Sequence, residues 1–222
     1  MMSMILESKP KTLEEDVYTR IGEDILTGVY ERGEALTELS LCKKLGVSRT
    51  PIRSALHRLA EEGLVEITPN KGAVVTGITE EDLIDTYKVR TRLEGLASEL
   101  CAERISKEAL AELEEAVSLA EYYISKNDTE KLKELDSRFH SIIYYASGNR
   151  MLCRILTELH KNIKAYRKLS LSVTGRGESS HREHRLILEA IKRGEGKRAD
   201  ELTSMHVKNA MENMLLAMKE ET

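Results

Sequence analysis

The stretch from Leu45 to Leu64 constrains the fold more than any other part of the chain. It reads LGVSRTPIRSALHRLAEEGL, which predicts the end of one short helix, a turn at Gly46 and a second helix that begins at Ser48. The Ser48 hydroxyl suits an N-cap, and Pro51 falls in the first turn, where its missing N–H costs nothing. Apolar residues follow at helical spacing and form a stripe for burial: Ile52, Ala55, Leu56 and Leu59.

The opposite face of this predicted helix is polar and cationic, with Arg49, Thr50, Arg53, His57 and Arg58. Residues 39–60 contain five Lys or Arg and no acidic residue. A short helix that is buried on one side and cationic on the other fits the major groove of DNA. An ordinary surface helix is the alternative for this stretch alone, so the flanking segments decide between them.

The flanking segments predict a winged helix-turn-helix domain. Helices are expected over residues 13–26 and 38–45, the second capped by Thr37. After Gly63 the pattern changes to two short strand candidates, residues 64–68 and 73–76, which a turn-forming Pro-Asn-Lys-Gly segment separates. A hairpin directly after the cationic helix reads as a wing, whose tip can reach DNA phosphates through Asn70, Lys71 and Gly72.

Residues 13–76 resemble the DNA-binding domain of the GntR family of bacterial transcription regulators. The resemblance rests on ILTGVYERGEAL, LGVSRTPIRSALHRLAEEGLV and NKGAVV. It implies that Arg49, Thr50 and Arg53 contact operator DNA and that Gly72 approaches the groove. Some members have an arginine in the preceding helix that also contacts DNA, and Leu39 occupies that place in this chain.

The rest of the chain predicts an all-α bundle, so the expected fold is mainly α. We divide the chain into a flexible tail (1–10), a winged helix-turn-helix domain (11–77) and a helical effector-binding and dimerisation domain (78–222). The helical pattern predicts six antiparallel helices, with a glycine-rich loop over residues 172–180. The expected helices cover residues 79–103, 106–126, 128–146, 151–171, 181–193 and 197–219.

Three histidines and one aspartate in the helical part form a candidate metal site. Asp136 and His140 are four residues apart, so they project from one face of a helix. His184 and His206 lie in the last two predicted helices. Three imidazoles and a carboxylate suit zinc, nickel, iron or manganese, and the ligand types alone do not choose among these ions. Surface pairs and hydrogen-bonded histidines are the alternative when spacing is the only evidence.

Residues 79–218 resemble the FCD domain, the helical effector domain of one GntR branch, the FadR-type branch. The resemblance rests on RTRLEGLASELCAER, ELDSRFHSIIYYASGN, HREHRLILEAIKRGEGKRADE and a late MH. It implies metal ligation by Asp136, His140, His184 and His206, with zinc as the first expectation, and leaves His160 and His181 outside the set. It also implies that a small organic acid lies near the metal, held by Arg90, with Asn149 first a helix cap and second a pocket residue. The alternative for Arg90 is an ion pair with Glu94.

Composition limits the remaining function classes. The net charge of −4 argues against general nucleic-acid affinity and confines DNA binding to a local patch. Three widely spaced cysteines and the lack of a long apolar run predict a reduced cytoplasmic protein with no membrane partner. A di-metal enzyme would need Glu-x-x-His on two helices, but Ser137, His181 and Thr203 stand three residues before the candidate ligands.

The sequence therefore predicts a transcription regulator and not an enzyme. We expect a homodimer, acting as a repressor, that binds double-stranded operator DNA and responds to a small carboxylate. The alternative is a DNA-binding regulator whose metal and helical domain serve only structure and dimerisation.

Overall fold

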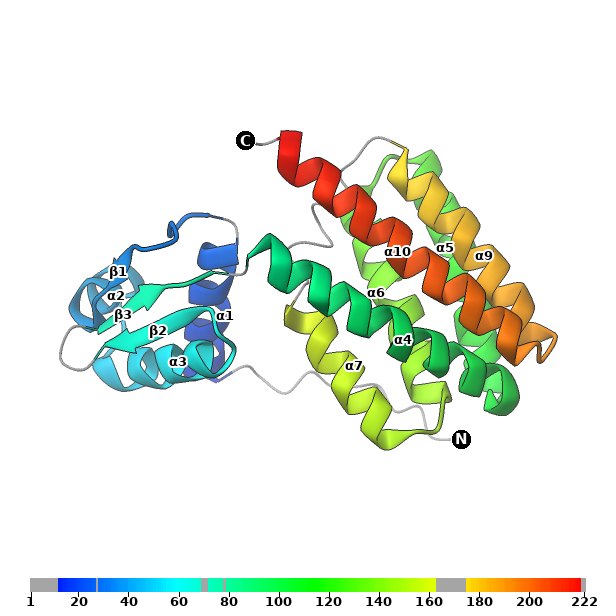
Figure 1. The fold of residues 1–222 in the computed structure, drawn as a ribbon, viewed down its shortest axis with the longest axis horizontal. Helices are drawn as coiled ribbons and strands as arrows, with labels where there is room; N and C mark the ends of the chain where they lie inside the picture. Colours follow the sequence, from blue (N-terminus) through cyan, green and yellow to red (C-terminus); the bar gives the residue numbers. More distant parts are fainter. Residues whose placement is uncertain (1–11, 27, 69–71, 78, 163–174, 221–222) are drawn as a thin grey trace. The chain divides into compact units, whose positions relative to one another are not determined.

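The structure is a computed structural model that describes residues 12–26, 28–68, 72–77, 79–162 and 175–220. The chain forms two compact units that divide between Thr79 and Glu80 (Figure 1). None of the described helices is long and apolar enough to cross a membrane.

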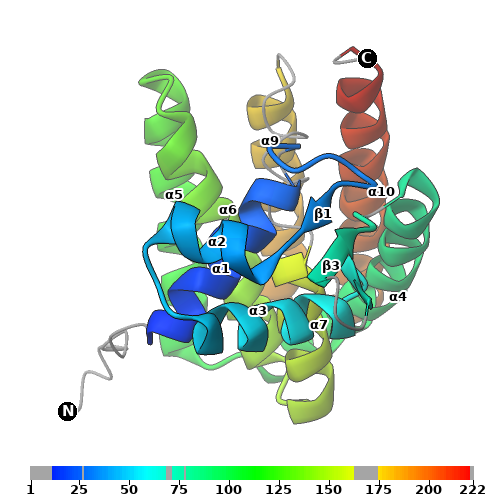
Figure 2. The same ribbon diagram turned by 90° about the vertical axis from the view of Figure 1, so that its left-hand side faces the viewer.

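Three helices form most of the N-terminal unit, and Figure 2 shows them together with two of its strands. They are α1 (Leu13–Leu26), α2 (Glu38–Leu45) and α3 (Arg49–Glu61). Thr37 caps α2, since its hydroxyl accepts a hydrogen bond from the Ser40 N–H, and Gly46 ends α2 with φ at 69°. The apolar faces of the helices share one core, which includes Val17, Ile21, Leu41, Ile52 and Leu59.

The wing is a three-stranded sheet and not a simple hairpin. Strands β2 (Val65–Thr68) and β3 (Gly72–Val75) pair antiparallel as predicted, but β1 (Ala35–Leu36) adds to the other edge of β3. The sequence carries no signal for β1, because a strand of two residues is too short to show an alternating pattern.

Gly72, the first residue of β3, packs closely against the backbone of Leu36 and Thr37. Its φ is 93°, and a Cβ there would collide with the carbonyl oxygen of Leu36. The pairing of β1 therefore requires glycine at this position, independently of any approach to DNA.

The C-terminal unit contains six helices within its described residues. They are α4 (Glu80–Arg104), α5 (Lys107–Ser125), α6 (Thr129–Ala146), α7 (Arg150–Asn162), α9 (Arg176–Lys192) and α10 (Gly196–Glu220). The fold class, a winged helix-turn-helix followed by an all-α bundle, is confirmed. Helix α9 begins at Arg176, so the loop predicted over residues 172–180 is wrong for its last five positions; residues 172–174 and the predicted helix beyond 162 lie outside the described residues.

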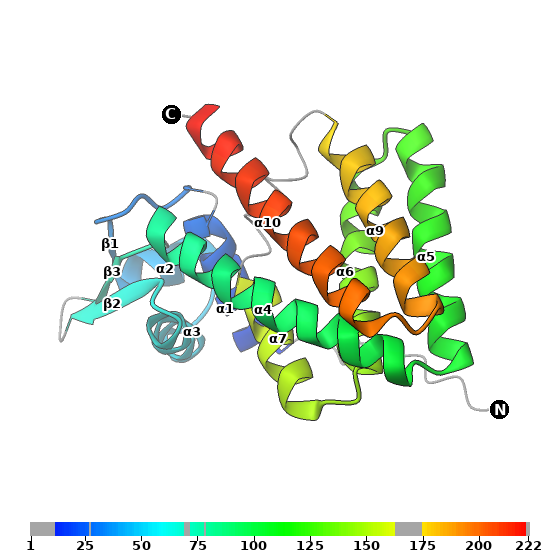
Figure 3. The same ribbon diagram turned by 45° about the vertical axis from the view of Figure 1, so that its right-hand side comes forward.

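Helix α4 packs along α10 through a close contact (Figures 1 and 3). A Cβ at Gly95 would collide with the Asp200 carboxylate, so this glycine lets the two helices approach. Behind them, one apolar core joins the bundle, with Leu113, Phe139, Ile143, Leu156 and Ile187 all buried. Burial in the same core raises the pKa of the Cys101 thiol to about 12, which keeps that cysteine protonated.

Candidate metal centre and DNA-binding surface

The cationic face of α3 is exposed as the sequence predicts. Its stripe of Ile52, Ala55, Leu56 and Leu59 is buried, whereas the opposite side presents Arg49, Thr50, Arg53 and His57 to solvent. Ser48 occupies the N-cap position in an extended conformation, but its hydroxyl makes no capping hydrogen bond, so the predicted cap is wrong in that detail. The first-turn N–H groups of α3 are left for other partners, such as a phosphate oxygen.

Arg53 is not free on this surface. Its guanidinium donates two hydrogen bonds to the Glu38 carboxylate, with Nε 2.8 Å from Oε1 and Nη2 3.1 Å from Oε2. Hydrogen bonding and charge attraction from Arg53 lower the pKa of Glu38, although desolvation opposes them. Sequence analysis did not foresee this ion pair, because its partners lie on different helices.

Two further predictions for this surface concern α2 and the wing. Leu39, beside Glu38 on α2, is 64% exposed, although large apolar side chains usually avoid solvent. Asn70 and Lys71 lie outside the described residues, and of the predicted wing tip only Gly72 is described.

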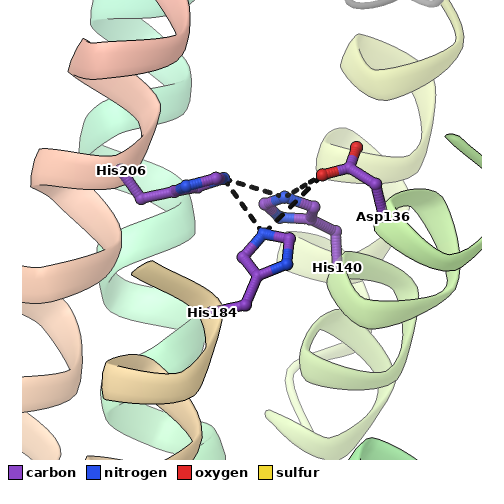
Figure 4. A group of neighbouring side chains, drawn as sticks. All are labelled: Asp136, His140, His184 and His206. Carbon is purple, nitrogen blue, oxygen red and sulfur yellow. Dashed lines mark hydrogen bonds and ion pairs between the residues drawn. The ribbon is translucent and has the colours of Figure 1, made fainter. Parts of the chain in front are cut away.

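The four candidate metal ligands converge inside the helical unit (Figure 4). Asp136 and His140 extend from α6, His184 from α9 and His206 from α10. Each offers one ligand atom, and these atoms lie within 4.8 Å of one another. The three histidines are buried, and Asp136 is partly exposed.

The separations suit a small divalent ion. Nε2 of His206 lies 3.2 Å from Nε2 of His140 and 3.3 Å from Nε2 of His184. Asp136 Oδ1 lies 3.9 Å from Nε2 of His140 and 3.6 Å from Nε2 of His184. Four tetrahedral bonds of about 2.0–2.1 Å would place neighbouring ligand atoms about 3.3 Å apart, close to the two distances from Nε2 of His206.

Two carboxylates orient the imidazoles from behind. Nδ1 of His140 lies 2.9 Å from Oε2 of Glu94, and Nδ1 of His206 lies 2.7 Å from Oε2 of Glu183. The ionised Glu183 carboxylate only accepts hydrogen bonds, so Nδ1 of His206 carries the proton. In its neutral form His206 then presents an unprotonated Nε2 to the other candidate ligands, and this is the form of the ring that coordinates a metal ion.

The Glu183 carboxylate accepts hydrogen bonds from three side chains, those of Arg176, His206 and Asn209. Burial raises the pKa of its carboxyl group, but hydrogen bonds from His206 and Arg176 outweigh burial and lower the pKa to about 2. Arg176 donates to both carboxylate oxygens, and Asn209 donates a further hydrogen bond of 2.7 Å. The third imidazole, that of His184, stacks on Phe139 with ring centroids 3.9 Å apart.

Arg90 is buried against the same site. Its Nε and Nη2 lie 2.7 and 2.6 Å from Oε1 of Glu94, so the ion-pair alternative is present in the structure. Desolvation is the largest single effect and lowers the pKa of Arg90, but the attraction of Glu94, Tyr87 and Tyr144 together with the hydrogen bond to Glu94 outweighs it, so the net shift is upward. The third nitrogen, Nη1, has no hydrogen-bond partner among the described residues, and neither has the buried Tyr87 hydroxyl.

Asn149 acts as a helix cap. Its Oδ1 accepts a hydrogen bond of 3.1 Å from the Leu152 N–H at the start of α7. This is the first of its two predicted roles.

The sequence alone did not predict that the carboxylates of Glu94 and Glu183 contact the candidate metal ligands His140 and His206. Glu183 stands next to His184 in the chain, and Glu94 follows Arg90 by one helical turn, which were the available signals. His160, which the sequence leaves outside the ligand set, lies near the site. Its ring centroid is 5.9 Å from that of His140, and its Nε2 is 3.4 Å from the Ser137 hydroxyl. No spacing within one helix predicts this approach, because His160 comes from α7.

Comparisons with known proteins agree with both units. Residues 13–75 match the gntR family of bacterial regulatory proteins, and residues 85–209 match the FCD domain. The uncharacterized HTH-type transcriptional regulator YdhC of Bacillus subtilis is 31% identical, over 96% of this chain and 95% of that protein. The HTH-type transcriptional repressor RspR of Escherichia coli is 22% identical, over 90% and 88%.

A solved structure gives the same fold. Escherichia coli McbR/YncC superimposes with a TM-score of 0.72 at 22% identity, over 95% of this chain and 99% of that chain. The matched families and the relatives are transcriptional regulators and not enzymes. With its winged helix-turn-helix and its helical FCD domain, the chain belongs to the gntR family of bacterial transcription regulators.

Proposed function

We propose that this regulator is a metal-dependent sensor of a small organic acid. The observation that carries the proposal is the convergence of three imidazoles and one carboxylate, with two of the imidazoles in contact with the carboxylates of the buried Glu94 and the partly exposed Glu183. Asp136, His140, His184 and His206 would hold the ion, which would offer a Lewis-acidic position to an acid group. Zinc suits the histidine-rich set best, with nickel, iron and manganese as alternatives.

Arg90 is the protein group best suited to the acid. A guanidinium grips carboxylates through paired N–H donors, and Nη1 of Arg90 is buried with no partner among the described residues. Glu94 connects it to the metal ligand His140. A carboxylate that binds Arg90 would weaken the ion pair between Arg90 and Glu94. Because Glu94 also contacts His140, the orientation of His140 would change when the ligand binds.

The regulated output is DNA binding by α3. Arg49, Thr50 and Arg53 are exposed and suited to base and phosphate contacts, with Ser48 and His57 beside them. The wing residues Asn70, Lys71 and Gly72 would contact the adjacent backbone. Since operator DNA is the partner, we place the protein in the cytoplasm and, like the relative RspR, among repressors.

A homodimer would bring two α3 helices to the two halves of an operator. Helices α4 and α7 contact each other and carry exposed apolar side chains, namely Val89, Leu96, Met151 and Ile155. Such a patch favours self-association through this face. Acid binding would change the relative population of dimer geometries, and thus the affinity for DNA.

The direct test combines elemental analysis of purified protein with operator binding by fluorescence anisotropy, with and without a panel of organic acids. We expect one metal ion per chain and an acid that shifts operator affinity. A protein that contains metal but responds to no acid would favour the alternative, a structural metal in a dimerisation domain. A protein that binds no divalent ion would contradict the proposal, because the acid is expected to bind at the metal.

A further inference from the structure

One large apolar side chain is exposed on the described helix-turn-helix, which comprises α2 and α3 (Figure 2). Leu39 of α2 is 64% exposed, whereas the other leucine and isoleucine side chains of these two helices are buried or partly buried. A single exposed leucine is ordinary on a protein surface. Its significance therefore depends on which side of α2 carries it.

Two ion pairs define the sides of α2. On one side, Nζ of Lys44 lies 3.3 Å from the carboxylate of Asp24 on α1. On the other side, the Glu38 carboxylate accepts a hydrogen bond of 2.8 Å from Nε of Arg53 on α3. Each residue advances about 100° around an α-helix, so a plane from the core to the solvent separates Leu39 and Glu38 from Lys44. Leu39 is therefore exposed on the flank of α2 that also carries Glu38, toward the cationic side of α3.

This flank combines an apolar group, a neutralised arginine and a cation. The Glu38 carboxylate offsets the charge of Arg53 through two hydrogen bonds, at 2.8 and 3.1 Å. Lys43 follows Leu39 by one helical turn and is exposed. A leucine cannot bind a phosphate, but the major groove also presents one apolar group, the C5 methyl group of thymine. A lysine suits the phosphate backbone at the edge of the groove.

We propose that Leu39 is a specificity-determining residue, which contacts the C5 methyl group of a thymine in the operator while Lys43 contacts the neighbouring backbone. The inference rests on the proposed function, because it requires α3 to lie in the major groove. The methyl group distinguishes thymine from cytosine, which presents an amino donor, and from the purines, which present an N7 acceptor. An apolar side chain leaves such polar groups without a partner, so this contact should favour thymine at one position of each half-site.

The test uses the full-length protein and a DNA duplex that the wild-type protein enriches from a random-sequence pool. Each thymine of this parent duplex is replaced in turn by deoxyuridine, which lacks the C5 methyl group and keeps its base pairing. Fluorescence anisotropy should show a loss of about fourfold in affinity at one thymine of each half-site, as expected for one buried group of this size. Equal affinity for the parent duplex and every deoxyuridine duplex would overturn the inference.

Leu39→Ala identifies the side chain that contacts the methyl group. This variant should bind the parent duplex and the sensitive deoxyuridine duplex with equal affinity, whereas Leu39→Met should retain most of the difference. Leu13→Ala makes the same change at an exposed leucine of α1 and should keep the full difference. A methyl dependence that is unchanged in Leu39→Ala would overturn the role of Leu39.

Lys43→Ala tests the backbone contact. It should weaken binding to all duplexes alike and reduce the slope of log affinity against log salt concentration by about one. An unchanged slope would contradict the contact of Lys43. Failure of the proposed function looks different, because Arg49→Ala and Arg53→Ala would then bind the parent duplex as tightly as the wild-type protein. If those two variants lose affinity and no thymine methyl group matters, this inference alone is wrong.

Discussion

Oε2 of Glu94 lies 2.9 Å from Nδ1 of His140, while Oε1 of the same carboxylate lies 2.6 Å from Nη2 of Arg90. One buried side chain thus fixes a candidate metal ligand and the arginine proposed to hold the effector. Because the two partners contact different oxygens of one carboxylate, a movement of Glu94 caused by either partner changes its contact with the other. Metal binding and acid binding should therefore be thermodynamically coupled.

Substitution of Glu94 by Gln should weaken metal binding by roughly ten- to hundredfold, since residues that orient a ligating histidine commonly have effects of this size. The measurement is competition with a chromophoric chelator. Glu103→Gln, an exposed position on the same helix, provides the control. Equal metal affinity in the Glu94 and Glu103 variants would show that Glu94 does not orient His140.

The double substitution His140→Ala with His184→Ala should remove the metal and leave a folded helical protein. Bound metal at 100 times its dissociation constant stabilises the folded state by about 2.7 kcal/mol, or roughly 5–10 °C in Tm. Chelation should therefore lower the Tm of the wild-type protein and not that of the double variant. Stoichiometric metal in the double variant would mean that the ligands are assigned incorrectly.

Arg49→Ala should weaken operator binding more than Arg53→Ala. Each arginine that makes a paired contact with a base contributes roughly ten- to hundredfold in affinity, but Arg53 must first leave Glu38. Fluorescence anisotropy over a range of salt concentrations measures both losses. Arg20→Ala, an exposed arginine on α1, is the control. If both α3 variants bind like this control, α3 is not the DNA-binding helix.

Gly72→Ala should destabilise the N-terminal unit by about 1–3 kcal/mol. The substitution combines a positive φ with a collision against the Leu36 carbonyl. Gly33→Ala is a matched control, because its φ is 89° and no atom lies within 4 Å of an added Cβ. Urea denaturation should show a larger loss at Gly72, and similar losses would mean that β1 moves away without cost.

Leu96→Glu with Ile155→Glu should convert the proposed dimer into a monomer, because the change puts charge on the exposed apolar face of α4 and α7. Light scattering after size exclusion reports the mass. Leu186→Glu, also exposed but on α9, should leave the mass unchanged. A wild-type monomer, or a dimer that survives the double change, would show that this face does not mediate association.

The sequence by itself determined the elements whose signals are local. The helix bounds of α1 and α2, the buried stripe of α3 and the strands β2 and β3 follow from periodicity, glycine turns and a capping threonine. The spacing of Asp136 and His140 placed both on one face of α6, because one helical turn separates them. The resemblance to the GntR and FCD domains added the expected roles of these residues in DNA binding and metal binding.

Only the tertiary structure decided which distant side chains meet. The contact of His140 with Glu94 and the pairing of Arg53 with Glu38 each join residues from different helices. The β1 pairing that makes Gly72 indispensable is of the same kind. Periodicity reports which face of a helix is buried, but the neighbour on that face depends on how the helices pack, and that packing is a property of the whole unit.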